Sequence, residues 1–181
     1  MKTLNKIGLV FLIIIAISLI AALFISKEVN YEKSISINAP IEVVWENVNS
    51  LADLDQWSPW NDYDPNMKKE MTGIDGTVGA SQSWESEIDE VGKGNQTIAK
   101  IEEPFLFETT LKFYTPYESE AKGYIKLVEE NGGTNVTWGF GSEMPYPFNL
   151  MKLFMSMEEM MDKDWNNGLT KLKTLCESEN L

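Results

Sequence analysis

The strongest constraint in this chain is a change in the period of its apolar residues. From Tyr31 to about Gly141, apolar and polar residues alternate in short runs, whereas from Phe154 to Cys176 apolar residues recur every three or four positions. Alternation is typical of strands with one buried face, and the longer period is typical of a helix with one apolar stripe. Neither part can bury its apolar face alone, so the sequence predicts an antiparallel sheet packed on a C-terminal helix.

The alternating part predicts about seven strands, with two short helices after the first strand. Pro40 suits the first turn of a helix, and Ser58-Pro59 ends the second short helix because a residue before proline avoids helical dihedral angles. The strands are expected at about 31–38, 67–72, 80–85, 95–101, 105–113, 121–127 and 136–141. The long helix is expected from about Pro147 to Cys176. Gly168 within it indicates a close approach to the sheet or a bend.

The N-terminal segment has a different character. Residues 7–25 form an apolar run without a charged side chain, and a helix of about 20 residues can cross a hydrocarbon core of roughly 30 Å. Lys2 and Lys6 favour a cytoplasmic N-terminus. The sequence therefore predicts a membrane anchor at residues 1–28 and a domain at residues 29–181, in a single-pass membrane protein with the domain on the extracytoplasmic side. A cleaved signal segment is the alternative, although the run exceeds a typical signal core and lacks an A-x-A site.

Charge and residue usage exclude several classes of function. The chain carries 15 basic and 28 acidic side chains for a net charge of −13, and every basic residue is lysine. Without histidine or arginine, no Ser-His-Asp triad, histidine metal ligand or arginine finger can form. The negative charge argues against nucleic acid as a partner. Asp62 begins a sequence like a calcium loop, but Met67 and Gly73 stand where glycine and glutamate are needed. We therefore expect no metal and no cofactor.

Several segments resemble a known superfamily. They are Ser36–Trp45, Trp-Ser-Pro-Trp at 57–60, Gly79-Ala80 with Trp84, Gly92-Lys-Gly94, 134–138 and 168–173. Over about residues 31–177 the chain resembles the SRPBCC proteins, the START/polyketide-cyclase-like superfamily. The resemblance implies an α+β helix-grip fold, in which a curved antiparallel sheet of about seven strands wraps around a long C-terminal helix. It also implies an apolar cavity between the two. Members bind lipids, polyketides or other apolar ligands, and a few are cyclases or dehydratases.

A set of large apolar side chains is predicted to line such a cavity. The strand members share the inward parity of their strands, and the methionines lie on or beside the helix stripe. The candidate ligand-binding residues are Trp84, Phe107, Phe113, Trp138, Phe140, Met151, Met155 and Met161. Core packing is the default interpretation of the methionines near the helix, but methionine is flexible and adapts to varied apolar partners, which suits a deformable pocket.

These observations leave three functions open. The first is a membrane-anchored module that binds an apolar small molecule, such as a lipid or a polyketide. The second is a cyclase or dehydratase that uses a carboxylate, such as Glu158 or Glu143, or a tyrosine in the same cavity. The third is a protein-interaction domain whose cavity is filled by its own side chains. No individual catalytic residue is predicted, because carboxylates in such positions more often belong to a solvated face and tyrosines at strand ends more often pack with the hydroxyl reaching water.

Overall fold

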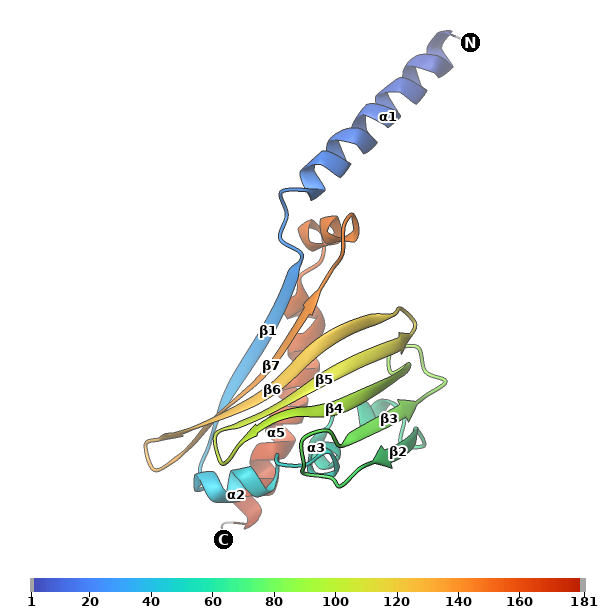
Figure 1. Cartoon of the computed structure of the whole chain (residues 1–181). Helices are drawn as coiled ribbons and strands as arrows, with labels where there is room; N and C mark the ends of the chain where they lie inside the picture. The colour runs from blue at the N-terminus through green and yellow to red at the C-terminus, as the bar shows by residue number, and fades with distance from the viewer. Residues whose placement is uncertain (1, 180–181) are drawn as a thin grey trace.

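The computed structural model describes residues 2–179, apart from the side chains at 2–5, 157 and 179 (Figure 1). The N-terminal half contains α1 (Lys2–Ala22), β1 (Glu28–Ile37), α2 (Ile41–Glu46), α3 (Leu51–Trp57), α4 (Trp60–Tyr63), β2 (Lys68–Thr72) and β3 (Ser81–Glu85). The C-terminal half contains β4 (Lys93–Glu102), β5 (Leu106–Thr115), β6 (Ser119–Glu130), β7 (Gly133–Glu143), the 3₁₀ helix η1 (Phe148–Leu153) and α5 (Met157–Glu179).

The sheet is antiparallel throughout, in the order β1-β7-β6-β5-β4-β3-β2. Successive strands from β2 to β7 are neighbours, and β1 pairs with β7, with Tyr31 opposite Phe140. The helix α5 lies along one face of the sheet, and α2 and α3 lie near its C-terminal half (Figure 1). This arrangement confirms the predicted α+β class and fits the helix-grip fold.

A hydrophobic core joins the sheet to the helices. Val44 of α2, Val136 of β7 and Leu172 of α5 are fully buried. Burying an aliphatic side chain of this kind contributes about 1.5–3 kcal/mol. The two periodicities of the sequence therefore meet at one interface, as the pattern predicted.

The long C-terminal helix begins later than predicted. Instead of a continuous helix from Pro147, the chain forms η1, and α5 begins only at Met157. The backbone N–H of Glu159 donates to Ser156 Oγ at 3.3 Å. Ser156 and Glu159 thus match the Ser-x-x-Glu pattern that marks a helix N-terminus, and Glu158 adds negative charge to the first turn. This local signal outweighs the apolar spacing, and Phe154 is 86% exposed.

The N-terminal segment departs from its prediction. The helix α1 ends at Ala22, three residues before the apolar run ends at Ile25. The helical part of the run, residues 7–22, is about 24 Å long at 1.5 Å per residue, which falls short of the roughly 30 Å hydrocarbon core. Nowhere in residues 2–179 is a helix long and apolar enough to cross a membrane. The predicted single-pass membrane localisation is therefore wrong, and the predicted anchor at residues 1–28 is not supported.

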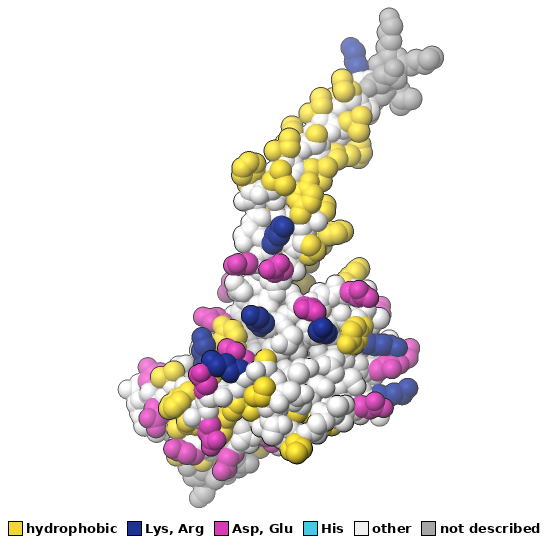
Figure 2. Space-filling model, viewed as in Figure 1, with side chains coloured by type: hydrophobic (Ala, Val, Ile, Leu, Met, Phe, Trp, Pro, Cys, Tyr) yellow, Lys and Arg dark blue, Asp and Glu magenta, His cyan; other side chains and the backbone are white. Residues whose placement is uncertain are grey.

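The end of α1 is tied to η1. The side-chain amide of Asn149 is fully buried and donates from Nδ2 to the carbonyl oxygens of Ala22 and Ile25, both at 2.8 Å. The ammonium of Lys152 donates to the carbonyl oxygen of Ser26 at 3.1 Å. These bonds satisfy carbonyl groups at and after the helix end. Hydrophobic side chains cover much of α1, whereas acidic and lysine side chains are scattered over the domain below it (Figure 2).

Candidate functional site

A cavity of about 420 Å³ lies between α3, α4 and α5 and the face of the sheet formed by β2 to β7. This volume falls within the roughly 300–1,000 Å³ that is usual for small-molecule sites. Most of its wall is apolar, and five of the six tryptophans of the chain contribute to it: Trp57, Trp60, Trp84, Trp138 and Trp165. The cavity is therefore suited to an apolar occupant with flat or bulky groups.

One row of the sheet carries an aromatic pair. Lys69, Trp84, Gly94 and Phe113 are successive partners across β2, β3, β4 and β5. The rings of Trp84 and Phe113 meet edge to face with centroids 5.7 Å apart. A Cβ at Gly94 would lie 2.3 Å from the Trp84 ring, so only glycine leaves the space that the indole occupies. The indole N–H of Trp84 donates to the carbonyl oxygen of Val91 at 3.1 Å and fixes the ring.

A second aromatic cluster joins the sheet to α5. The rings of Trp138 and Trp165 stack with centroids 4.4 Å apart, and Trp60 meets both rings edge to face. Trp165 is also fixed by its indole N–H, which donates to the carbonyl oxygen of Trp138 at 3.2 Å. A Cβ at Gly168 would lie 2.8 Å from the Trp138 ring. Of the two interpretations of this glycine, the structure shows the close approach to the sheet.

The structure brings six of the eight predicted ligand-binding residues together. The cavity is lined by Trp84, Phe107, Phe113, Trp138, Phe140 and Met161. Met151 and Met155 do not line it, and they are 44% and 37% exposed. Their placement was inferred by extending the stripe of Met161 backwards, but the break between η1 and α5 changes the direction of the chain. Ligand binding by these eight residues stays a prediction.

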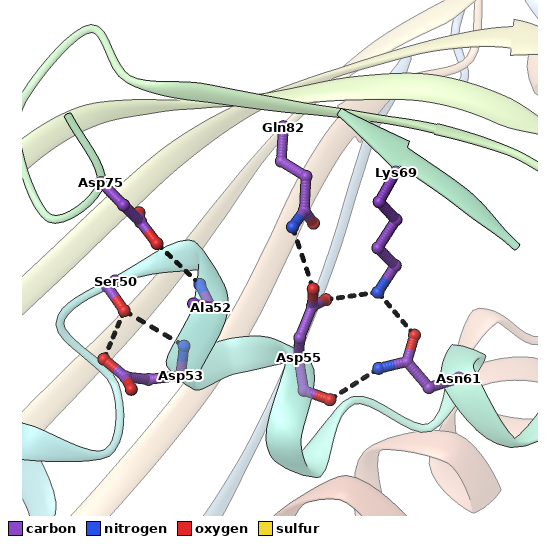
Figure 3. A network of polar contacts seen from close by, with 8 residues as sticks. All are labelled: Ser50, Ala52, Asp53, Asp55, Asn61, Lys69, Asp75 and Gln82. Carbon is purple, nitrogen blue, oxygen red and sulfur yellow. Dashed lines mark hydrogen bonds and ion pairs between the residues drawn. The ribbon is translucent and has the colours of Figure 1, made fainter. Parts of the chain in front are cut away.

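The cavity wall also contains a polar network that the sequence analysis missed (Figure 3). The ammonium of Lys69 donates to Asp55 Oδ1 and to Asn61 Oδ1, each at 2.7 Å. The amide Nε2 of Gln82 donates to Asp55 Oδ2 at 2.9 Å. The amide of Asn61 donates to the backbone carbonyl of Asp55 at 2.6 Å. The network therefore joins α3, α4, β2 and β3, and all four side chains line the cavity.

The position of Asp55 is set by the start of α3. Asp75 accepts the backbone N–H groups of Leu51 and Ala52, both at 2.9 Å, and Ser50 Oγ accepts the N–H of Asp53 at 3.1 Å. These acceptors satisfy the free N–H groups of the first helical turn. Since Asp55 follows one turn later, the cap determines where its carboxylate meets the sheet.

A further polar pair lies in the next row of the sheet. Gln82 stands opposite Gln96, and Gln96 stands opposite Leu111. The amide of Gln96 donates to Thr109 Oγ1 at 3.0 Å, and Thr109 is only 3% exposed. Polar side chains on the inward face of a strand were the signal that could have revealed this part of the site, because a buried polar group requires a partner.

The acidic side chains considered for catalysis lie elsewhere. Glu143 and Glu158 are exposed and do not line the cavity. Asp162 pairs with Lys33 and accepts a hydrogen bond from the hydroxyl of Tyr31 at 3.0 Å, where α5 meets β1. Within residues 2–179, no three histidine, cysteine or acidic side chains gather closely enough to hold a metal ion.

Comparison with known proteins places the chain in context. Residues 28–177 match the family described as polyketide cyclase / dehydrase and lipid transport. No curated protein matches the chain. A solved structure from Nitrosospira multiformis is 23% identical, with a TM-score of 0.59 over 83% of this chain and 98% of that one. One from Mesorhizobium loti is 13% identical, with a TM-score of 0.60 over 84% of this chain and 100% of the other. The structure of Ara h 8.0201 is 13% identical, with a TM-score of 0.55 over 84% of this chain and 97% of that one. These structures support the fold.

Proposed function

The chain belongs to the polyketide cyclase / dehydrase and lipid transport family, and we propose that it binds an apolar small molecule in the cavity between its sheet and α5. The observation that carries this proposal is the open cavity of about 420 Å³ with its aromatic wall. Burial of an apolar ligand there contributes about 25 cal/mol for each Å² removed from water. The domain at residues 29–181 is the unit that we expect to hold this site.

The open cavity favours ligand binding over the third function considered from the sequence. In an interaction domain with a filled core, Trp84 and Phe113 would pack against the methionines of the helix. Instead, their rings line open space, and Met161 of α5 lines the same space. Because the cavity is open, its aromatic wall lacks the close dispersion contacts that a packed core would give it. A ligand that fills it recovers those contacts.

Binding of a neutral apolar probe to the full chain tests the proposal. We expect 2-methoxynaphthalene to bind, to change the tryptophan fluorescence and to raise the melting temperature. At one hundred times its dissociation constant, the probe should add about 2.7 kcal/mol to the free energy of unfolding.

Two matched variants locate the site. Met161→Trp places a larger side chain in the cavity and should abolish probe binding, whereas Met155→Trp adds the same group outside the cavity and should leave binding unchanged. Each variant must first show a cooperative melt. Failure of the probe to bind the wild-type protein, or equal binding by both variants, would contradict the proposal.

A further inference from the structure

The polar network in the cavity wall has unused hydrogen-bonding capacity. Two of the three N–H groups of the Lys69 ammonium donate to Asp55 and Asn61. Each carboxylate oxygen of Asp55 accepts one hydrogen bond, from Lys69 or from Gln82, although each can accept a second. One N–H of Lys69 and a lone pair of each Asp55 oxygen are thus left for a ligand. A hydroxyl group, which both donates and accepts, matches this combination.

The charges of the network favour an uncharged group. Lys69 and Asp55 form an ion pair at 2.7 Å, and their side chains are only 24% and 29% exposed. Because the two charges compensate each other, a third charge in this half-buried place would lack a partner. The cavity wall contains two further charged side chains, Asp89 and Glu90, and both are acidic. An anionic headgroup would therefore meet a net negative wall, and a cationic one would lie beside the Lys69 ammonium.

The network is also adjacent to the aromatic wall. Lys69 stands directly opposite Trp84 in the pairing of β2 with β3. Gln82 lies two residues before Trp84 on β3, and therefore on the same face about 7 Å away. Figure 3 shows the side chains of Asp55, Lys69 and Gln82 pointing toward one another. A ring system that contacts Trp84 can thus place a substituent at these three side chains.

We propose that Asp55, Lys69 and Gln82 form a subsite that binds an uncharged hydroxyl group of an otherwise apolar ligand. This inference rests on the proposed binding function and specifies the ligand class. The hydroxyl donates to Asp55 and accepts from Lys69, while the apolar body occupies the aromatic part of the cavity. A carboxylate in the same place is rejected.

Calorimetric titration of the full chain with three probes of one shape tests the subsite. The probes are 2-naphthol, 2-methoxynaphthalene and 2-naphthoate. If burial of the additional methyl group were the only difference, the ether would bind about fourfold tighter than naphthol. Hydrogen bonds to charged groups favour naphthol by about tenfold or more. We therefore expect naphthol to bind at least about threefold tighter than the ether, and naphthoate to bind weakest.

A variant without the charges provides the comparison. Asp55→Asn combined with Lys69→Gln removes both members of the pair and leaves no unpaired charge. It should keep its affinity for the ether, which shows that the cavity is intact, and it should bind the ether tighter than naphthol. The exposed pair Glu85 and Lys93, with a 2.8 Å contact on β3 and β4, supplies the control. Glu85→Gln combined with Lys93→Gln should leave all three affinities unchanged.

The outcomes separate this inference from the proposed function. If the ether and naphthol both bind but the ether binds tighter to the wild-type protein, the hydroxyl subsite is refuted and apolar binding stands. If naphthoate binds at least as tightly as naphthol, the subsite takes anions and the inference is again refuted. If none of the three probes binds, the proposed function itself fails.

Discussion

Trp165 offers the sharpest test of how α5 docks on the sheet. It is 3% exposed, its ring stacks on Trp138 at 4.4 Å, and its indole N–H donates to the Trp138 carbonyl. A buried tryptophan removes about 200 Å² from water, which corresponds to about 5 kcal/mol at 25 cal/mol per Å². Substitutions of tryptophan by alanine in cores cost about 3–5 kcal/mol. Because Trp165 borders a cavity that water can refill, we expect Trp165→Ala to cost about 3 kcal/mol.

Thermal unfolding followed by the circular dichroism of the helices measures this loss of stability without relying on tryptophan fluorescence. For a domain of this size, about 3 kcal/mol corresponds to a decrease of about 6–12 °C in the melting temperature. Lys163→Ala, on the exposed side of the same helix, should change it by less than about 2 °C. A Trp165→Ala protein that melts with the wild type would refute the docking of α5 through this side chain.

Two further perturbations follow from the contacts around α5. Gly168→Ala should lower the melting temperature, because the new Cβ would lie 2.8 Å from the Trp138 ring. This clash should outweigh the roughly 1 kcal/mol by which alanine is favoured over glycine in a helix. A higher melting temperature would argue against the close approach. Burial, followed by the hydrogen bond to Asp162, raises the pKa of Tyr31 to about 12 from its usual value near 10. Folding thus favours the neutral phenol, and this stabilisation is complete below pH 10 and lost as the pH rises to about 12. Urea unfolding should show a steeper loss of stability over this range for the wild type than for Tyr31→Phe, and equal slopes would exclude the shift.

Much of the fold follows from local patterns of the sequence. Alternation predicted the strands because one face of each is buried. Asn131 and Gly132, both with positive φ, form the turn between β6 and β7. The continuous helix from Pro147 was wrong because apolar spacing was allowed to outweigh the capping pattern of Ser156 and Glu159. Spacing reports which residues share a face of a helix, but only capping reports where the helix begins.

The polar part of the site could not be placed from the sequence. The network residues lie on three separate elements: Asp55 on α3, Lys69 on β2 and Gln82 on β3. None of them belongs to a sequence motif that indicates a site. Their meeting depends on the pairing of β2 with β3 and on the capping of α3 by Asp75. The apolar part was easier, because strand parity alone brings residues such as Trp138 and Phe113 to one face.

The central claim, that the cavity on the inner face of the sheet holds an apolar ligand, is tested most directly by the methionine methyl groups. Met67 and Met161 line the cavity, whereas Met151 and Met155 do not. In the full chain labelled with ¹³C at these methyl groups, titration with 2-methoxynaphthalene should shift the signals of Met67 and Met161. The signals of Met151 and Met155 should stay in place. Shifts confined to Met151 and Met155, or none at Met161, would contradict the account.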